Sequence, residues 1–414
     1  MSEEKDSFLP YRWELLILLW FAFLFNQADR AMFGFVMPLI KTDLQLTDVQ
    51  LGLVASTFHL FYGILAPFAG YVGDIFRRSR IVVLSIFTWS LATLLTGLSS
   101  HIVHLILFRG ASLSLGEAFY LPSANALICQ FHEKTRAFAM SIHQTALYCG
   151  MIGSGILAGW LGMRYGWRAP FLLFGILGIL WAGVLFFRLK DAVSENRSEK
   201  SLVTHKIPVS EVLSYLFHHP CIWLMALIFG CLVFINVGYI TWMPTLLHEH
   251  FQLSLASAGF SSMFYHVLGA LGGVLLGGKI SDWAVRRRAD GRLILAATGF
   301  LCAAPFLFML GKSATLLGTL VGVGGFGFFR GICDSTFFPL LLDGVENRYR
   351  SSIQGFVISF GLLIGALAPI ALGIMKTSIG LPWGMALMAG VSLAGVFFLG
   401  IARCFFPPSQ EIDR

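Results

Sequence analysis

The chain has 414 residues, of which 57% are hydrophobic and only 12% are charged, and its mean hydropathy is +0.77. About a quarter of the residues of a soluble domain are charged, so this composition excludes a soluble protein and predicts a polytopic membrane protein. The net charge of +7 does not indicate a nucleic-acid partner, because the basic residues gather in short loops between apolar segments, where they set orientation.

Apolar runs of roughly 20 residues, long enough to cross ~30 Å of hydrocarbon, recur along the chain. They predict an all-α membrane protein with 12 transmembrane helices. No metal, haem, nucleotide-phosphate or hydrolase motif is present, so we expect neither an enzyme nor a cofactor. The predicted spans are 13–39, 50–74, 80–99, 102–127, 137–160, 169–188, 220–247, 256–282, 292–310, 314–341, 351–374 and 381–403.

The first span carries polar residues near its middle, namely Asn26, Asp29 and Arg30. An ionisable side chain at this depth costs roughly 2.5–3.5 kcal/mol on insertion scales. Two interpretations are open: an ion pair that joins helices, or a proton or substrate site. We favour the site, because a buried ion pair contributes little net stability.

The end of the second span is repeated at the end of the eighth. Residues 70–74 run from Gly70 to Asp74, four residues before Arg78, and Asp282 ends a similar segment four residues before Arg286. We predict that these acids and arginines form a conformational latch through charge-assisted hydrogen bonds. The alternative is a basic cluster that only sets orientation. Such repeats also predict two related halves with a site between them.

Two further spans carry charged residues at similar depth. Arg109 and Glu117 lie in the fourth span, and Arg330 and Asp334 lie one helical turn apart in the tenth. A spacing of four residues suits a pair within one helix. For Arg330 and Asp334, a structural brace and a substrate contact are therefore equally open.

A long polar segment divides the spans into two groups of six. It predicts an N-terminal six-helix bundle (1–189), a cytoplasmic linker (190–219) and a C-terminal six-helix bundle (220–414). The stretch VSEVLSYLFHHP in the linker is expected to form a short amphipathic helix. Lys and Arg outside the spans are concentrated on the linker side, which places both termini in the cytoplasm and the protein in the inner or plasma membrane. A monomer is expected.

The chain resembles the major facilitator superfamily over essentially its full length. The loop GYVGDIFRRSR is similar to the signature loop of that superfamily. NQADR in the first span, GEA followed by Pro122 in the fourth, GWR before the sixth and WMPTLL in the seventh resemble the anion:cation symporter family. Spinster-type lipid transporters share the Asp-Arg pair of helix one and the Arg-to-Glu run of helix four.

The resemblance implies a secondary active transporter that moves a small organic anion, such as a sugar acid or other carboxylate, with protons by alternating access. The alternative is a spinster-like carrier of lysophospholipid or another amphiphile. The expected partners are an anionic small molecule, protons and membrane lipid, with no nucleic acid.

We predict Asp29 and Glu117 as the proton-coupling residues and Arg30 as the anion-binding residue, because a guanidinium donates two bonds to one carboxylate and stays charged. Histidines within the spans, His59, His143 and His266, are interpreted as packing residues. Further expected substrate-binding residues are Arg109, Asn26, Gln144, Tyr148, Tyr239 and Trp242.

The spacing in the fourth span departs from both families, in which Arg and Glu are usually seven residues apart. Here Arg109 and Glu117 are eight apart, which turns them about 80° from each other on an α-helix. Either a local bulge restores their alignment or Arg109 faces elsewhere.

Overall fold

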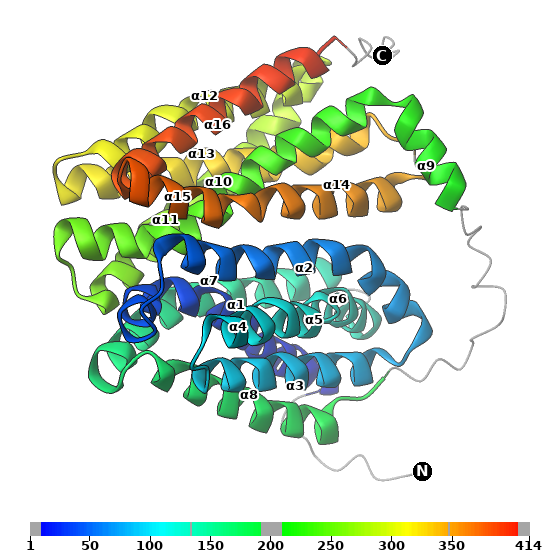
Figure 1. The fold of residues 1–414 in the computed structure, drawn as a ribbon. Coiled ribbons are helices and arrows are strands. Elements are labelled where there is room, and N and C mark those ends of the chain that lie inside the picture. Colours follow the sequence, from blue (N-terminus) through cyan, green and yellow to red (C-terminus); the bar gives the residue numbers. More distant parts are fainter. Residues whose placement is uncertain (1–9, 133–134, 192–208, 347, 405–414) are drawn as a thin grey trace, which may run out of the picture.

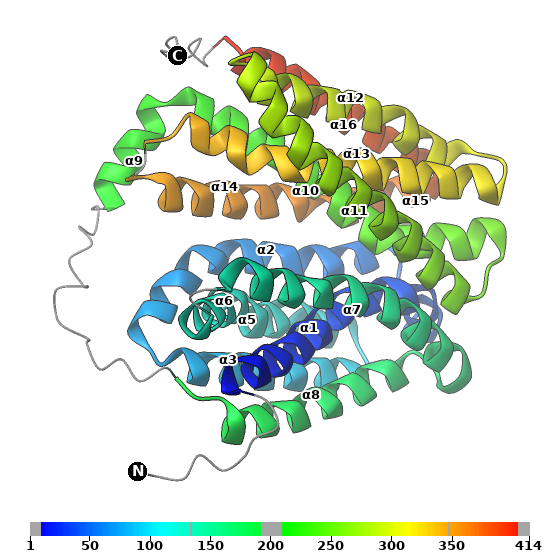
Figure 2. The same cartoon turned by 180° about the vertical axis from the view of Figure 1, so that it is seen from behind.

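The computed structural model describes residues 10–132, 135–191, 209–346 and 348–404, without the side chains of 70–75, 137, 209, 213 and 351. Its described regular structure is helical, and it contains 12 helices that are long and apolar enough to cross a membrane. The predicted fold class is therefore confirmed. Figures 1 and 2 show two layers of helices, one built from each half of the chain.

The first half contains the first six spans, and its fourth span is built from several short pieces. The elements are α1 (Tyr11–Asp43), α2 (Asp48–Ile75), α3 (Arg78–Gly97), α4 (Ile102–Leu105), the π-helix η1 (Ile106–Ser112), α5 (Leu113–Ala118), α6 (Tyr120–Phe131), α7 (Arg136–Tyr165) and α8 (Arg168–Arg188).

The second half contains the other six spans, and α14 and α15 together form the eleventh. The elements are α9 (Val209–His218), α10 (Pro220–Phe251), α11 (Leu255–Arg287), α12 (Gly291–Lys312), α13 (Leu316–Asp343), α14 (Arg350–Gly365), α15 (Leu367–Ser378) and α16 (Leu381–Ala402).

The short helix α9 lies where the amphipathic linker helix is predicted, and it packs on the second half. The Tyr215 ring stacks on the Tyr349 ring with 4.1 Å between centroids, and the Tyr349 hydroxyl donates a 2.7 Å hydrogen bond to Glu211. We call the end of the molecule that carries α9, Tyr11 and Arg188 the linker side, and the opposite end the far side.

Within each half, helices cross closely at glycines. A Cβ at Gly116 in α5 would lie 2.5 Å from the backbone nitrogen of Trp89 in α3. A Cβ at Gly273 in α11 would lie 1.9 Å from the carbonyl oxygen of Phe328 in α13. Only glycine permits backbones to approach this closely, as is common where membrane helices pack.

The two halves meet toward the far side. A Cβ at Gly159 of α7 would lie 2.5 Å from Cα of Ala256 at the start of α11, and one at Gly52 of α2 would lie 2.4 Å from the carbonyl oxygen of Pro369 in α15. Nearer the middle of α2, the Ser359 hydroxyl donates a 2.5 Å hydrogen bond to the carbonyl of Gly63. The far side is therefore closed by close backbone packing together with a buried apolar cluster from both halves.

A buried lysine adds an ion pair to this far-side contact. Lys376 of α15 lies 3.1 Å from the Asp48 carboxylate of α2 and 2.7 Å from the Glu249 carboxylate of α10. Lys41 of α1 binds the other oxygen of Asp48 at 2.7 Å. The Lys376 side chain is only 10% exposed, and these carboxylates compensate its charge. Lys376 thus joins the two halves.

Candidate functional site

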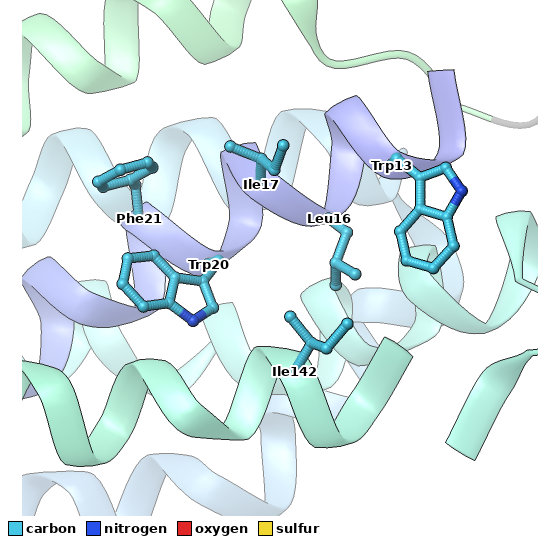
Figure 3. A pocket seen from close by; sticks show the side chains of 6 residues that line it. All are labelled: Trp13, Leu16, Ile17, Trp20, Phe21 and Ile142. Carbon is cyan, nitrogen blue, oxygen red and sulfur yellow. The ribbon is translucent and has the colours of Figure 1, made fainter. Parts of the chain in front are cut away.

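Two hollows lie among the residues that the structure describes, and the first is an apolar groove of about 420 Å³ on the outer face of α1 and α7. Figure 3 shows its lining. The Trp20 indole donates a 2.9 Å hydrogen bond to the Thr145 hydroxyl. This groove offers no charged group to a polar substrate. Its lining residues are Trp13, Leu16, Ile17, Trp20, Phe21 and Ile142.

The second hollow is a cavity of about 460 Å³ between the two halves. Its wall is apolar except for a few polar and charged side chains from each half, which is the usual composition of a small-molecule site. The polar residues on its wall are Gln27, Arg30, His59, Arg109 and Tyr148 from the first half, and Asn236, Thr241, His266, Arg330 and Asp334 from the second.

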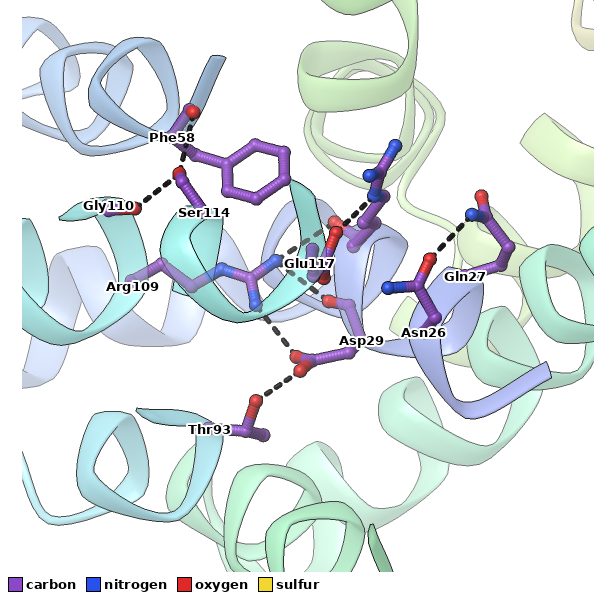
Figure 4. A network of polar contacts seen from close by, with 10 residues as sticks. Asn26, Gln27, Asp29, Phe58, Thr93, Arg109, Gly110, Ser114 and Glu117 are labelled. Atoms are coloured by element: carbon purple, nitrogen blue, oxygen red, sulfur yellow. Dashed lines mark hydrogen bonds and ion pairs between the residues drawn. The ribbon is translucent and has the colours of Figure 1, made fainter. Parts of the chain in front are cut away.

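Asp29 and Arg109 form a buried ion pair in the first half (Figure 4). The Arg109 Nη1 donates a 2.7 Å hydrogen bond to Asp29 Oδ1, and the Thr93 hydroxyl donates to Asp29 Oδ2. The Arg109 Nη2 donates to the backbone carbonyls of Asp29 and Arg30, at 2.7 and 3.0 Å. Arg109 therefore holds the middle of α1 by its backbone as well as by its charge.

Arg30 and Glu117 form the second ion pair, and only one partner is accessible. The Arg30 Nε donates a hydrogen bond to Glu117 Oε2, and the Glu117 side chain is fully buried while that of Arg30 is 32% exposed. The Arg30 guanidinium lies 4.7 Å from the centre of the Tyr62 ring and 5.4 Å from that of Phe58. An anion in the cavity would therefore meet Arg30 before any other charged group of this half.

The π-helix η1 explains the eight-residue spacing in the fourth span. It contains Arg109 and adds a residue to the turn before α5, so Arg109 and Glu117 both reach α1. The Ser114 hydroxyl donates to the carbonyls of Gly110, at 2.6 Å, and Phe58, at 2.8 Å. Of the two alternatives, the local bulge is the one that occurs. Such π-turns are frequent at functional sites.

The second half places a smaller charged cluster on the cavity wall. The Arg330 Nη2 lies 3.2 Å from Asp334 Oδ2, and Nη1 lies 3.1 Å from His266 Nε2. A guanidinium can only donate, so His266 Nε2 is the acceptor and Nδ1 carries the proton of the neutral ring. His59 and His266, interpreted as packing residues from the sequence, both lie on the cavity wall, and the His59 ring also contacts the carbonyl of Ala55 at 3.1 Å.

Two predicted substrate contacts lie away from the cavity wall. Tyr239 and Trp242 are fully buried. The Tyr239 hydroxyl donates to the carbonyl of Ser262, and the Trp242 indole donates a 3.0 Å hydrogen bond to the carbonyl of Pro369. Their polar atoms bind the backbones of neighbouring helices, so the prediction that they bind substrate is corrected.

Of the uncharged residues of the first half that were predicted to bind substrate, some lie on the cavity wall and others do not. Tyr148 lies on the cavity wall as expected, whereas the exposed Gln144, one turn before it, does not. Asn26 is buried, and its side-chain oxygen accepts a 2.8 Å hydrogen bond from Gln27 Nε2 (Figure 4). Gln27 is the residue of this pair that lines the cavity. Asn26 and Gln144, predicted to bind substrate, therefore do not lie on the cavity wall.

The predicted latch is described only in part. The surroundings of Gly70 and the side chain of Asp74 lie outside what the structure describes, and Arg78 is the first residue of α3. In the second half, Asp282 forms its ion pair at 3.5 Å with Arg292 of α12 and not with Arg286. Arg292 also binds Asp343 of α13 at 2.5 Å. The latch stays a prediction, with Arg292 as the described partner of Asp282.

Comparison with known proteins identifies the family. The model of the Major Facilitator Superfamily matches residues 19–369. This chain belongs to the Major Facilitator Superfamily. It is 24% identical to the hexuronate transporter of Bacillus subtilis, over 95% of this chain and 94% of that protein. It is 26% identical to a probable galactarate/D-glucarate transporter of Escherichia coli, over 92% of this chain and 90% of that protein.

The fold is also that of solved members of the superfamily. A bacterial homologue of the human lysosomal transporter Spinster, in an inward-facing and occupied conformation, superposes with a TM-score of 0.81. The two share 20% identity over 97% of this chain and 98% of the other. The predicted family and multi-pass membrane architecture are confirmed, and relatives named as transporters agree with the expectation of a protein that is not an enzyme.

Proposed function

We propose that this superfamily member is a secondary active transporter of a small organic anion, a sugar acid or other carboxylate, that moves with protons. The observation that carries the proposal is the position of Arg30, which is accessible in the cavity between the halves while its partner Glu117 is buried behind it. A guanidinium in this position favours a carboxylate over a neutral or cationic substrate. The names of the hexuronate and galactarate/D-glucarate relatives support the same class.

Proton coupling follows from competition for Arg30. When a substrate carboxylate binds the guanidinium, Glu117 loses the partner that compensates its buried charge. An uncompensated buried carboxylate is costly, and taking up a proton removes that cost. Glu117 is thus the first proton site of the proposal. Asp29, which shares Arg109 and Thr93, is the second.

Arg109 has a different part in this proposal from the one expected of it. Its guanidinium donates hydrogen bonds to the Asp29 carboxylate and to two backbone carbonyls of α1, and its side chain is only 5% exposed. It therefore positions α1 and pairs with the Asp29 carboxylate. Arg30 is the residue that touches the substrate.

The closed far side defines one state of an alternating-access cycle. If the linker side is cytoplasmic, as the distribution of Lys and Arg supports, the two halves meet on the outer side and the structure faces inward. Moving the halves about the cavity would then expose Arg30 to the other side of the membrane.

The proposal is tested with purified protein in liposomes. Labelled D-glucuronate is supplied outside, with the interior made alkaline relative to the bath. We expect accumulation above the external concentration and its collapse on adding a protonophore. Uptake indifferent to the pH difference would overturn proton coupling. Transport of lysophospholipid in place of every carboxylate tested would favour the spinster-like alternative.

A further inference from the structure

The outer face of the first half holds an apolar groove that the proposed function does not use. Helices α1 and α7 cross closely where a Cβ on Gly150 would lie 2.6 Å from the carbonyl oxygen of Leu24. Toward the linker side they leave between them the groove of about 420 Å³ described above, which is lined by Trp13 and, two turns later, by Trp20 (Figure 3). The groove is therefore a hollow between two helices and is distinct from the convex surface that the rest of α1 and α7 offers to lipid.

The groove has the length and the lining that suit one hydrocarbon chain. Trp13 and Phe21 are eight residues apart in α1, which places about 12 Å between them along the helix axis. The Trp20 indole nitrogen is bonded to the Thr145 hydroxyl, so that ring offers only hydrocarbon to the groove. Ile17 and Phe21 are 46% and 39% exposed, which leaves the long side of the groove open to the bilayer. An acyl chain can therefore enter it sideways from the membrane.

Two arginines flank the linker-side end of this groove. Arg12 precedes Trp13, and its guanidinium lies 5.9 Å from the centre of the Trp13 ring. Arg136 is the first residue of α7, and Phe138, two residues later, packs edge-on against Trp13 with 6.3 Å between ring centroids. Both arginines are exposed, and neither forms an ion pair with a carboxylate in the described part of the chain. The groove thus ends at two positive charges without a described counter-charge.

We propose that this groove binds one phospholipid with an anionic headgroup, with an acyl chain between α1 and α7 and its phosphate at Arg12 and Arg136. Guanidiniums bind phosphate oxygens through paired, charge-assisted hydrogen bonds. The acid nearest in sequence, Glu14, does not neutralise them, because it binds Arg188 of α8 at 2.6 Å. Two uncompensated positive charges favour a headgroup of net negative charge over a zwitterionic one, and anionic lipids gather where basic residues meet the membrane surface.

A lipid in this position joins two helices that belong to the transport machinery. Asp29 and Arg30 lie in α1, and Gly159 of α7 contacts the second half at the start of α11. An anionic headgroup bonded to both arginines connects the linker-side ends of α1 and α7, which a neutral lipid does not do. This inference concerns a surface away from the cavity and does not depend on the transported substrate.

The test compares two lipids that differ only in the headgroup. Purified full-length protein in detergent is mixed with equal amounts of dioleoyl phosphatidylglycerol, which is anionic, and dioleoyl phosphatidylcholine, which is zwitterionic. Bound lipid is then counted by native mass spectrometry. We expect the wild-type protein to retain a single phosphatidylglycerol at least tenfold more often than a single phosphatidylcholine. Equal retention of the two lipids would overturn the proposal.

Charge variants test the headgroup contact. Arg12→Gln combined with Arg136→Gln should lower the preference for phosphatidylglycerol to less than twofold. The matched control, Arg77→Gln combined with Arg80→Gln, removes two exposed arginines at the linker-side end of α3 and should keep the wild-type preference. If the first double variant does not fold, each of its single substitutions should lower the preference at least threefold. A preference that persists in every folded variant of Arg12 and Arg136 contradicts the assignment.

A further variant tests the groove itself. Ile17→Trp fills it, and we expect this variant to retain both lipids at least threefold less often, whereas Leu180→Trp, at an exposed position of α8 outside the groove, should behave like wild type. Glycerol phosphate, which has the phosphate but no acyl chain, should not displace phosphatidylglycerol at tenfold excess. Displacement by glycerol phosphate, or undiminished binding in Ile17→Trp, would mean that the arginines bind an anion without the groove and would overturn the proposal. Lipid retention involves no transport, so its failure leaves the proposed function standing.

Discussion

Arg30 is bound by one carboxylate, that of Glu117, and its guanidinium is also accessible from the cavity, where a substrate carboxylate could bind. Its Nε binds the buried Glu117, while Tyr62 and Phe58 support the face of its guanidinium. This arrangement fixes the arginine without closing it off from the cavity. The neighbouring Asp29 has no such access, because Arg109 and Thr93 enclose its carboxylate.

Replacing Arg30 by lysine tests the shape of the guanidinium group separately from its positive charge. Arg30→Lys keeps the positive charge but loses the planar fork, so we expect the substrate dissociation constant to rise by at least tenfold. The measurement is titration of D-glucuronate into the purified variant. Arg164→Gln, which alters a basic residue outside the cavity, serves as the control and should bind like wild type. Wild-type affinity in Arg30→Lys would contradict direct binding at this residue.

Replacing Glu117 distinguishes proton coupling from substrate exchange across the membrane. Glu117→Gln keeps a hydrogen-bond acceptor for Arg30 but cannot take up or release a proton. We expect exchange of labelled for unlabelled substrate to persist, while accumulation driven by a pH difference falls at least tenfold. Asp29→Asn should show the same loss of accumulation. Undiminished accumulation in both variants would show that these residues are not the proton sites.

At this scale, sequence alone identifies the charges but only part of their surroundings. Asp29, Arg30 and Glu117 stand out because a charge within an apolar span is costly. The Thr93 partner gives no such signal, since threonine is unremarkable in a membrane helix. The position of His266 is missed for a similar reason: it depends on Arg330, which is 64 residues away.

The fourth span shows how one extra residue changes a helix. In η1 the wider turn compensates for the eight-residue spacing, and Arg109 still reaches Asp29. The departure in spacing is visible in the sequence, but the bulge can be located only once the positions of Asp29 and Glu117 are known. Local propensity does not fix it, because a π-turn depends on tertiary contacts such as that of Ser114 with Phe58.

Deleting one residue of η1 should therefore be tolerated. Removing Ala111 shortens the Arg109 to Glu117 spacing to seven, which a regular α-helix aligns within about 20°. We expect a folded protein whose melting temperature in detergent lies within about 5 °C of wild type. Deleting Leu84 from the regular helix α3 is the control, and it should give aggregated protein because every later side chain of that helix changes face. Equal behaviour of the two deletions would contradict this account of η1.

The two-bundle organisation of the whole molecule follows from hydropathy, and the structure adds which end is closed. Twelve spans and a polar linker can be predicted from the sequence because bilayer thickness sets their length. The side of the membrane to which the cavity opens cannot be predicted from the sequence, because the same spans are present in every state of the transport cycle. The far-side bridge of Lys376 to Asp48 and Glu249 depends on how the halves are docked.

Removing the Lys376 charge should weaken far-side closure. Lys376→Met loses the 3.1 Å ion pair with Asp48 across the two halves, while Asp48 keeps Lys41. Spin labels on α2 and α15 should then report a larger fraction of long distances by pulsed electron resonance. Lys312→Met, at an exposed far-side lysine, is the matched control and should give the wild-type distribution. Identical distributions in both variants would assign the closure to backbone and apolar packing without a contribution from Lys376.

The apolar contact at the far side has a thermodynamic consequence. Main-chain atoms meet where α7 crosses α11, since a Cβ on Gly155 would lie 2.8 Å from the carbonyl oxygen of Gly259. Beside this crossing, apolar side chains of both halves form one buried cluster that includes Met37 and Ile40 of α1 and Met243 and Leu247 of α10. Opening the far side exposes this hydrocarbon to water, which raises the heat capacity. The enthalpy of opening should therefore change with temperature, and cooling should shift the balance between the two faces of the carrier.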